Sequence, residues 1–188
     1  MRALLQRVRR ASVVVGDESV AAIETGLLVF LGIHPRDDRQ TVRWLSDKAL
    51  NLRIFDERGK MNRSVLDIEG GIMVVSQFTL YAEAASGRRP NFSPAASREV
   101  AEPLYEYFVD LCRVKSDKVV TGRFGAPMEV SLVNWGPVTV WIDSADRKRD
   151  REQGGDVTNA SRIAKTARHS GHTAPRVGPH GEDAKDRH

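Results

Sequence analysis

Hydrophobic and polar residues alternate along the first part of the chain in a way that predicts a β-hairpin followed by a buried strand. Residues 2–8 and 12–15 alternate as strands do, Gly16-Asp17 is typical of a turn, and residues 19–23 form the return strand of the hairpin. Residues 27–33 are a continuous apolar run, which indicates a strand buried on both faces.

Two later segments have apolar side chains at helical spacing. The first helix is predicted over residues 39–51, and its apolar face comprises Val42, Leu45, Ala49 and Leu52. The second helix is marked by an apolar set at i, i+3, i+4 and i+7 spacing: Leu104, Tyr105, Phe108, Leu111 and Cys112. Pro103 fits the first turn of a helix but not its interior, so the segment before it is predicted to be a separate turn or a kinked start.

Short apolar and β-branched runs predict the remaining strands. They cover residues 52–55, 72–76, 78–81, 118–124, 128–133 and 138–142. About eight strands favour a sheet that closes into a barrel, because closure removes exposed strand edges. The predicted fold is therefore α/β (mainly β): a closed or nearly closed β-barrel with two outer helices.

The composition changes after the last predicted strand. The chain has 188 residues and a net charge of +4, and from Asp143 onward it has ten Lys or Arg against eight Asp or Glu. Half of the net charge (+2 of +4) thus lies in this last segment, which weakens the indication of a polyanionic partner. Residues 145–188 have no Phe, Tyr or Trp and few large aliphatic residues, so we expect a barrel domain over 1–144 and a disordered polar tail.

The motifs that usually mark a hydrolase or a cofactor site are missing from the sequence. It has no Gly-x-Ser-x-Gly, His-Glu-x-x-His, Cys-x-x-Cys or phosphate-binding glycine loop, and the tail histidines are irregularly spaced. His34 is interpreted as a solvated loop histidine and Cys112 as a buried structural thiol. We therefore expect no metal and no cofactor. With no run long enough to cross a bilayer and no signal-peptide pattern, a cytoplasmic protein without a membrane partner is expected.

Polar side chains inside apolar strands are the remaining candidates for chemistry. Ser76, Gln77 and Thr79 interrupt VVSQFTLY, and each needs a hydrogen-bond partner because a buried unsatisfied group costs about 1–3 kcal/mol. Their side chains either hydrogen-bond to the backbone at a strand end or form a functional site, and the residues alone favour neither interpretation. Arg88 and Arg89 in SGRRPNF likewise belong to a solvated loop or contact phosphate.

A Gly-Pro pair interrupts the last strands, in NWGPVTVW, although proline within sheets is confined to edges, strand starts and bulges. This segment, SQFTLYAEAASGRRPNFS and the N-terminal ALLQRVRRASVVV resemble the D-aminoacyl-tRNA deacylases, small homodimeric barrels that remove D-amino acids from tRNA. The similarity is collinear from Met1 to Ile142 and includes LRIFDERGKMNRSV. It implies an enzyme that hydrolyses the ester of D-aminoacyl-tRNA, and also of glycyl-tRNA, as chiral proofreading in translation.

The resemblance also assigns roles to individual residues. It places one segment in the pocket for the aminoacylated end of tRNA, with wall and tRNA-binding residues around it. The pocket segment comprises Ser76, Gln77, Phe78, Thr79 and Leu80, the wall Phe124 and Met128, and the tRNA contact Arg88 and Arg89. Gly136 and Pro137 are expected to form a cis peptide bond, braced by Arg7, that reaches across the homodimer into the partner's pocket.

Chirality would then follow from sterics. Carbonyl groups of the Gly-Pro corner would hold the substrate's α-ammonium group, and a rigid wall beside its Cα would leave room for a D side chain only. Backbone N–H groups near Gln77 and Phe78 are expected to stabilise the oxyanion, with water activated by the neighbouring ribose hydroxyl. Thr79 has the position of a nucleophile, but no residue in the sequence activates it.

Trp135 departs from the family pattern, which has an acidic residue before the Gly-Pro. The ring is expected to pack across the dimer without disturbing Gly136, and the alternative is a relaxed D-selectivity. Two other functions stay open. One is a non-catalytic nucleic-acid-binding protein on the same fold, and the other is an editing deacylase for L-alanyl- or glycyl-tRNA with a trans Gly-Pro.

Overall fold

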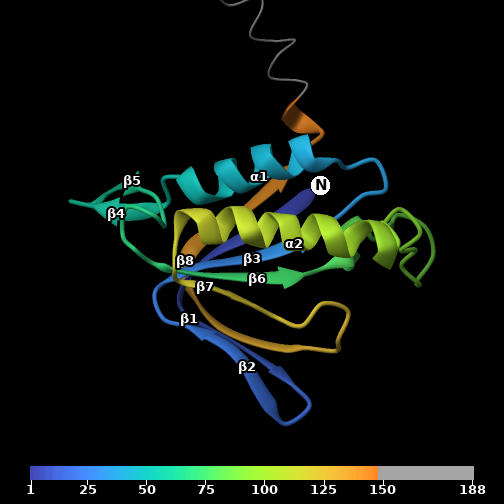
Figure 1. Ribbon diagram of the computed structural model, residues 1–188, viewed down its shortest axis with the longest axis horizontal. Coiled ribbons are helices and arrows are strands. Elements are labelled where there is room, and N and C mark those ends of the chain that lie inside the picture. Colours follow the sequence, from blue (N-terminus) through green and yellow to red (C-terminus); the bar gives the residue numbers. More distant parts are fainter. Residues whose placement is uncertain (148–188) are drawn as a thin grey trace, which may run out of the picture. The chain divides into compact units, whose positions relative to one another are not determined.

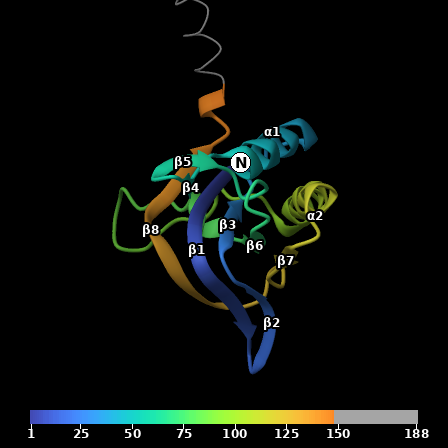
Figure 2. The same ribbon diagram turned by 90° about the vertical axis from the view of Figure 1, so that its left-hand side faces the viewer.

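The sheet is organised around β1 (Arg2–Val15), a strand that pairs with three others. In the computed structural model, which describes residues 1–147, the first half of β1 pairs with β3 (Gly26–Gly32) and the second half with β2 (Glu18–Ile23). The other edge of β1 pairs with β8 (Glu129–Asp143) along nearly its whole length. Figures 1 and 2 show β8, β1 and β3 in this order across the sheet. The two strands predicted within residues 2–15 are therefore one.

The inner strands are parallel, and the helices cover one face of them. β3 pairs with β6 (Gly71–Ser76), and β6 pairs with β7 (Val119–Thr121). The helices α1 (Arg39–Asn51) and α2 (Arg98–Lys115) lie side by side over this part of the sheet (Figure 1). The sheet curls into a nearly closed barrel, so the prediction of a mainly-β barrel with two helices is confirmed. β3 is apolar throughout because both of its faces are buried, as predicted.

The two ends of the described chain meet beside α1. The N-terminal ammonium group of Met1 donates to Asp37 Oδ1 and to Ser144 Oγ, both at 2.6 Å. The backbone N–H of Ser144 donates back to the Met1 carbonyl at 2.8 Å. Residues 1–147 form one compact unit. Of the tail predicted to be disordered, residues 145–188, all but the first three residues lie outside the described part of the chain.

The first helix has the predicted limits, whereas the second begins earlier than expected. Asp38 caps α1, because its Oδ1 accepts from the backbone N–H of Thr41 at 2.7 Å. α2 begins at Arg98, so Pro103 lies inside it and the prediction of a separate turn before Pro103 is wrong. The first N–H groups of a helix have no intrahelical partner, so a proline this close to the start removes only one bond beyond them.

The predicted strand at residues 78–81 is also wrong, because this segment forms the 3₁₀ turn η1 (Phe78–Tyr81). The Gln77 carbonyl accepts from Leu80 N at 3.3 Å, and the Thr79 carbonyl accepts from Ala82 N at 3.0 Å. The turn packs so closely on β3 that a Cβ at Gly32 would lie 2.9 Å from the Gln77 carbonyl oxygen. The glycine therefore makes room for the turn.

A small hairpin replaces the strand predicted at residues 52–55. It consists of β4 (Phe55–Glu57) and β5 (Lys60–Arg63), joined through Arg58 and Gly59 at φ values of 52° and 81°. Glycine adopts this left-handed region without steric cost, which explains its place in the turn. Figure 1 shows the hairpin projecting from one end of the sheet. The strand predicted over 118–124 is shorter, since β7 spans only Val119–Thr121.

The strands predicted over 128–133 and 138–142 are joined through the Gly-Pro segment as one strand, β8, with a large bulge. In the β1–β8 ladder Gln6 pairs with Thr139, and the next pair is Val8 with Asn134. Residues 135–138 therefore stand opposite the single residue Arg7. On its other side β8 has no recorded strand partner in the described part of the chain. An edge strand with a bulge is a place where a proline is tolerated.

Candidate functional site

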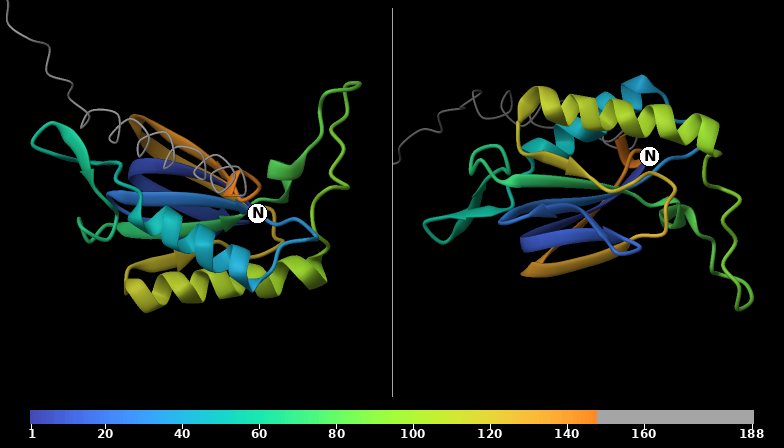
Figure 3. Two further views of the ribbon diagram at one scale, coloured as in Figure 1. Left: turned by 90° about the horizontal axis from the view of Figure 1, so that it is seen from above. Right: turned by 60° about the horizontal axis from the view of Figure 1, so that its bottom comes forward.

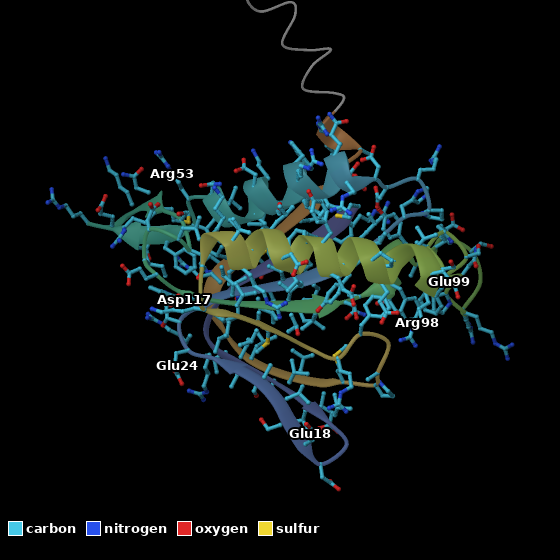
Figure 4. The ribbon with its side chains drawn as sticks, in the orientation of Figure 1. Glu18, Glu24, Arg53, Arg98, Glu99 and Asp117 are labelled. Carbon is cyan, nitrogen blue, oxygen red and sulfur yellow. The ribbon has the colours of Figure 1, made fainter. Side chains whose placement is uncertain are left out.

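A cavity of about 250 Å³ lies where β3 and β6 end, beside the start of α2. Its walls include Ser76, Gln77 and Phe78 after β6, and Phe124 from the connection between β7 and β8. Arg98 and Gly125 complete the opposite side. Figure 4 labels Arg98 and Glu99 at this end of α2, next to that connection. The carboxyl ends of parallel strands thus lead into a cavity that is mostly apolar, with a few polar groups.

The backbone at the start of η1 has unused donors beside this cavity. The N–H of Gln77 donates to the Leu31 carbonyl at 2.8 Å, and so extends the β3–β6 pairing. The N–H groups of Phe78 and Thr79 have no hydrogen-bond partner within residues 1–147. The Thr79 hydroxyl accepts from the Gln77 side-chain amide, and no carboxylate or imidazole of the described residues hydrogen-bonds to it. The segment can therefore stabilise an anion, but it has no activated nucleophile.

An arm formed by residues 82–97 begins directly after η1. A two-way backbone pair between Glu83 and Asn91, at 2.8 and 2.9 Å, closes it. Phe92 packs edge-on against Phe78, with ring centroids 5.3 Å apart, and so connects the arm to the cavity wall. Arg88 and Arg89 are exposed beyond the Glu83–Asn91 pair. Figure 3 shows the arm standing away from the barrel, and both arginines at its tip are exposed.

The Gly136–Pro137 corner is exposed and held from within by two side chains. Its peptide bond is cis. Arg7, which is only 4 % exposed, donates from Nε to the Trp135 carbonyl at 3.0 Å and from Nη1 to the Ile54 carbonyl at 2.6 Å. The Asn134 side-chain amide donates to the carbonyls of Arg7 and Val138, at 3.0 and 3.1 Å, across the base of the bulge.

The candidate residues do not all meet at one place in the chain. Ser76, Gln77, Phe78 and Phe124 line the cavity, whereas Thr79 lies beside it and Arg88 and Arg89 lie on the arm. The Leu80 carbonyl accepts from Arg2 Nη1 at 2.9 Å on the side of β1, and Met128 packs against Gly122 and against a buried cluster that includes Val13 and Met73. Arg7, Gly136 and Pro137 lie elsewhere: β3 residue Leu31 of the cavity is opposite Ala3, four positions along β1 from Arg7.

The sequence interpretation missed Arg98 and Gly125. Arg98 forms a two-point ion pair with Glu102, at 2.9 and 3.1 Å, and the hydrogen bond lowers the pKa of the Glu102 carboxyl. Its guanidinium carbon lies 5.9 Å from the centroid of the Phe124 ring. Gly125, at a φ of 71°, turns the chain beside this guanidinium. The only sequence signal for Arg98 is its position after Ser97, a residue type that favours helix starts.

Three titratable groups have pKa values that their surroundings shift. Burial raises the pKa of the Tyr105 phenol, whose hydroxyl donates to the Val74 carbonyl at 2.8 Å. Burial likewise raises the pKa of the Cys112 thiol to about 12. Burial and the nearby Arg36 lower the pKa of His34, whose Nδ1 accepts from the backbone N–H of Arg36. The described residues contain no cluster of three or more potential metal ligands.

Fold and cavity together define a small β-barrel with a mostly apolar cavity at the carboxyl ends of its parallel strands, and Phe78 and Phe124 are the aromatic residues of its wall. The family model described as D-Tyr-tRNA(Tyr) deacylase matches residues 4–143, so the chain belongs to this family. Among curated proteins it is 55% identical over 154 residues to the D-aminoacyl-tRNA deacylase of Roseiflexus sp., covering 81% of this chain and 99% of that one. It is 52% identical over 145 residues to the D-aminoacyl-tRNA deacylase of Thermosipho africanus, with coverages of 77% and 97%.

Solved structures have the same fold. The chain matches a structure titled c-Myc DNA Unwinding Element Binding Protein with a TM-score of 0.72 and 41% identity, over 76% of this chain and 98% of that one. It also matches a probable eukaryotic D-amino acid tRNA deacylase with a TM-score of 0.66 and 21% identity, over the same shares of the two chains. At that identity the second likeness bears on the fold alone.

Proposed function

We propose that this chain hydrolyses the ester that joins a D-amino acid to the terminal ribose of tRNA, and releases the free D-amino acid and tRNA. It is an aminoacyl-tRNA ester hydrolase of the D-aminoacyl-tRNA deacylase family. The observation that carries this conclusion is the family match over residues 4–143, which spans both the cavity segment and the Gly-Pro corner. No helix within residues 1–147 could span a membrane. We place the activity in the cytoplasm, where aminoacyl-tRNA is used in translation.

The chemistry relies on backbone donors and on the substrate itself. The ester carbonyl enters the cavity beside the free N–H groups of Phe78 and Thr79, which stabilise the oxyanion formed when water attacks the carbonyl carbon. The neighbouring ribose hydroxyl accepts a proton from the attacking water as it passes its own to the leaving ribose oxygen, so the bond from the carbonyl carbon to that oxygen breaks and the tRNA leaves with both hydroxyls. Gln77 N is not one of the donors, because it already pairs with Leu31. Gln77 contributes its side-chain amide, which orients Thr79.

The Gly136–Pro137 corner acts on the cavity of a partner subunit in a homodimer. Both residues are exposed in the single chain, and neither lines its own cavity. In the partner's cavity the corner holds the α-ammonium group and forms the wall that rejects an L side chain. Glycine has no side chain to reject, so glycyl-tRNA is a second substrate. Leu80 and Met128 belong to the substrate-binding set of residues, and Arg7 positions the corner through its bond to the Trp135 carbonyl.

The arm supplies the contact to the rest of the tRNA. Arg88 and Arg89 have no recorded protein partner within residues 1–147, and the arm meets the cavity wall at the Phe78–Phe92 contact. A phosphate bound to this pair would therefore belong to a nucleotide near the one in the cavity. The non-catalytic binding protein is not favoured, because the curated relatives described above are named as deacylases.

Subunit mixing tests whether the corner acts across the dimer. Pro137→Ala damages the corner, and Ala101→Trp fills the cavity, whose wall includes Ala101. In randomly mixed dimers about half are heterodimers, and one of their two sites has an intact cavity and an intact corner, so about a quarter of the wild-type rate on D-Tyr-tRNA returns. Two inactive variants that stay inactive after subunit exchange would contradict a corner acting in trans.

Thr79→Ala tests the absence of a protein nucleophile. Because no base of the described residues activates the Thr79 hydroxyl, the variant keeps kcat/KM for D-Tyr-tRNA within about tenfold of wild type. Single-turnover deacylation measures this. A loss of more than about a thousandfold in a folded variant would show that the hydroxyl takes part in the chemistry.

A further inference from the structure

The side chain and the main chain of Trp135 are both bound by arginines of β1. The guanidinium carbon of Arg9 lies 3.4 Å from the centroid of the Trp135 ring, and that of Arg7 lies 4.5 Å from it. Arg7 also donates to the Trp135 carbonyl at 3.0 Å. The edge of the ring meets Phe55 of β4, with centroids 6.3 Å apart and planes at 73°. The residue directly before Gly136 is thus held on several sides.

Irregularities in the β1–β8 ladder place both arginines at this ring. Arg7 stands opposite the four-residue bulge, since Gln6 pairs with Thr139 and Val8 with Asn134. Arg9 has no counterpart at all, since the pair after Val8–Asn134 is Arg10 with Val133. Bulges of this kind re-aim the side chains at the irregularity. Arg7 is buried, whereas Arg9 is exposed and covers the ring from solvent.

We propose that Trp135 is a positioning residue for the Gly136–Pro137 corner, and that its stack with Arg7 and Arg9 sets how sharply the enzyme separates D- from L-aminoacyl esters. This inference rests on the proposed function. Gly136 and Pro137 are exposed and have no ladder partners, so the corner depends on its flanking residues for its position. Trp135 supplies an anchor on one flank, because a desolvated guanidinium on an indole face is among the stronger cation–π contacts.

The placement matters because the corner discriminates by shape. Displacing a group at a reacting centre by about 1 Å changes rates by on the order of a hundredfold. The selectivity between enantiomers is at least as sensitive to the position of the corner, since a small outward displacement of the corner makes room for the L side chain. Loosening the anchor should therefore slow cleavage of the D-ester and admit the L-ester.

The test is the ratio of kcat/KM for D-Tyr-tRNA to that for L-Tyr-tRNA. Both esters use the same folded enzyme, so a loss of stability alone leaves this ratio unchanged. Trp135→Ala should lower the ratio about tenfold or more, and Trp135→Phe, which keeps a ring, should restore it to within about threefold of wild type. Arg9→Met should lower it about threefold, because it removes only the outer cation.

Arg10→Met is the matched control for Arg9→Met. It removes the same charge from the next residue of β1, and Arg10 stacks on no ring of the described residues. Its ratio should equal that of wild type. If Trp135→Ala fails to fold, the comparison of Arg9→Met with Arg10→Met still decides. Equal ratios in these two variants, or a wild-type ratio in folded Trp135→Ala, would overturn the inference. A wild-type enzyme that cleaves no D-ester would instead overturn the proposed function.

Discussion

The stability of the Gly-Pro bulge depends on Asn134, whose side-chain amide donates to the carbonyls of Arg7 and Val138 at 3.0 and 3.1 Å. Each such bond contributes about 1 kcal/mol net, and its loss leaves a half-buried carbonyl short of a donor. Asn134→Ala should therefore lower the free energy of unfolding by about 2 kcal/mol. Because one bond joins the two ends of the bulge and the other connects it to β1, the same variant should also slow cleavage of the D-ester.

Asn62→Ala is the matched control. Asn62 takes part in two side-chain hydrogen bonds, with Arg53 and Glu57, but they are exposed and measure 3.3 and 3.4 Å. Its removal should change the free energy of unfolding by no more than about 0.5 kcal/mol. Urea unfolding measures the free energy of unfolding of both variants. The comparison is made at one protomer concentration and requires m-values equal to that of wild type. If Asn134→Ala loses no more stability than Asn62→Ala, the amide does not hold the bulge.

Three further outcomes follow from single contacts. Tyr105→Phe removes the buried hydrogen bond to the Val74 carbonyl and should cost about 1 kcal/mol in thermal or urea unfolding, and an unchanged stability would contradict that bond. Cys112, with its thiol pKa raised to about 12 by burial, should not react with a disulfide reagent at pH 8 until the protein unfolds, and rapid labelling of the native protein would contradict its burial. Replacing Arg88 and Arg89 with Ala should reduce the number of ions released on tRNA binding by about one to two, as read from the slope of the logarithm of the binding constant against the logarithm of the salt concentration. An unchanged slope would exclude both residues from the phosphate contact.

The inner strands and α1 could be predicted from the sequence because burial determines their residue types. β3 is apolar at every position since helices cover one of its faces and the curled sheet covers the other, and Asp38 gives α1 a local start signal. The segment at 78–81 could not be predicted in the same way. Its pattern fits a strand, but Gly32 on another strand admits a tight turn, and that contact is tertiary.

The cavity segment was predicted through family resemblance, whereas its other side was not. Ser76, Gln77 and Phe78 belong to a motif that carries the resemblance, Phe124 is a position that the resemblance assigns, and all four line the cavity. Arg98 reaches the cavity only because α2 begins earlier than Pro103 suggests. Asn134 is a polar residue in an apolar run, but its two acceptors lie on β1 and on the far side of the bulge. No local pattern contains that information.

The most direct test of the central claim is the rate at which wild-type protein deacylates D-Tyr-tRNA and L-Tyr-tRNA under identical conditions. The value of kcat/KM should be at least about a hundredfold higher for the D-ester, because the wall beside the Cα leaves no room for an L side chain. Equal cleavage of both esters, or tRNA binding without cleavage of either, would contradict it.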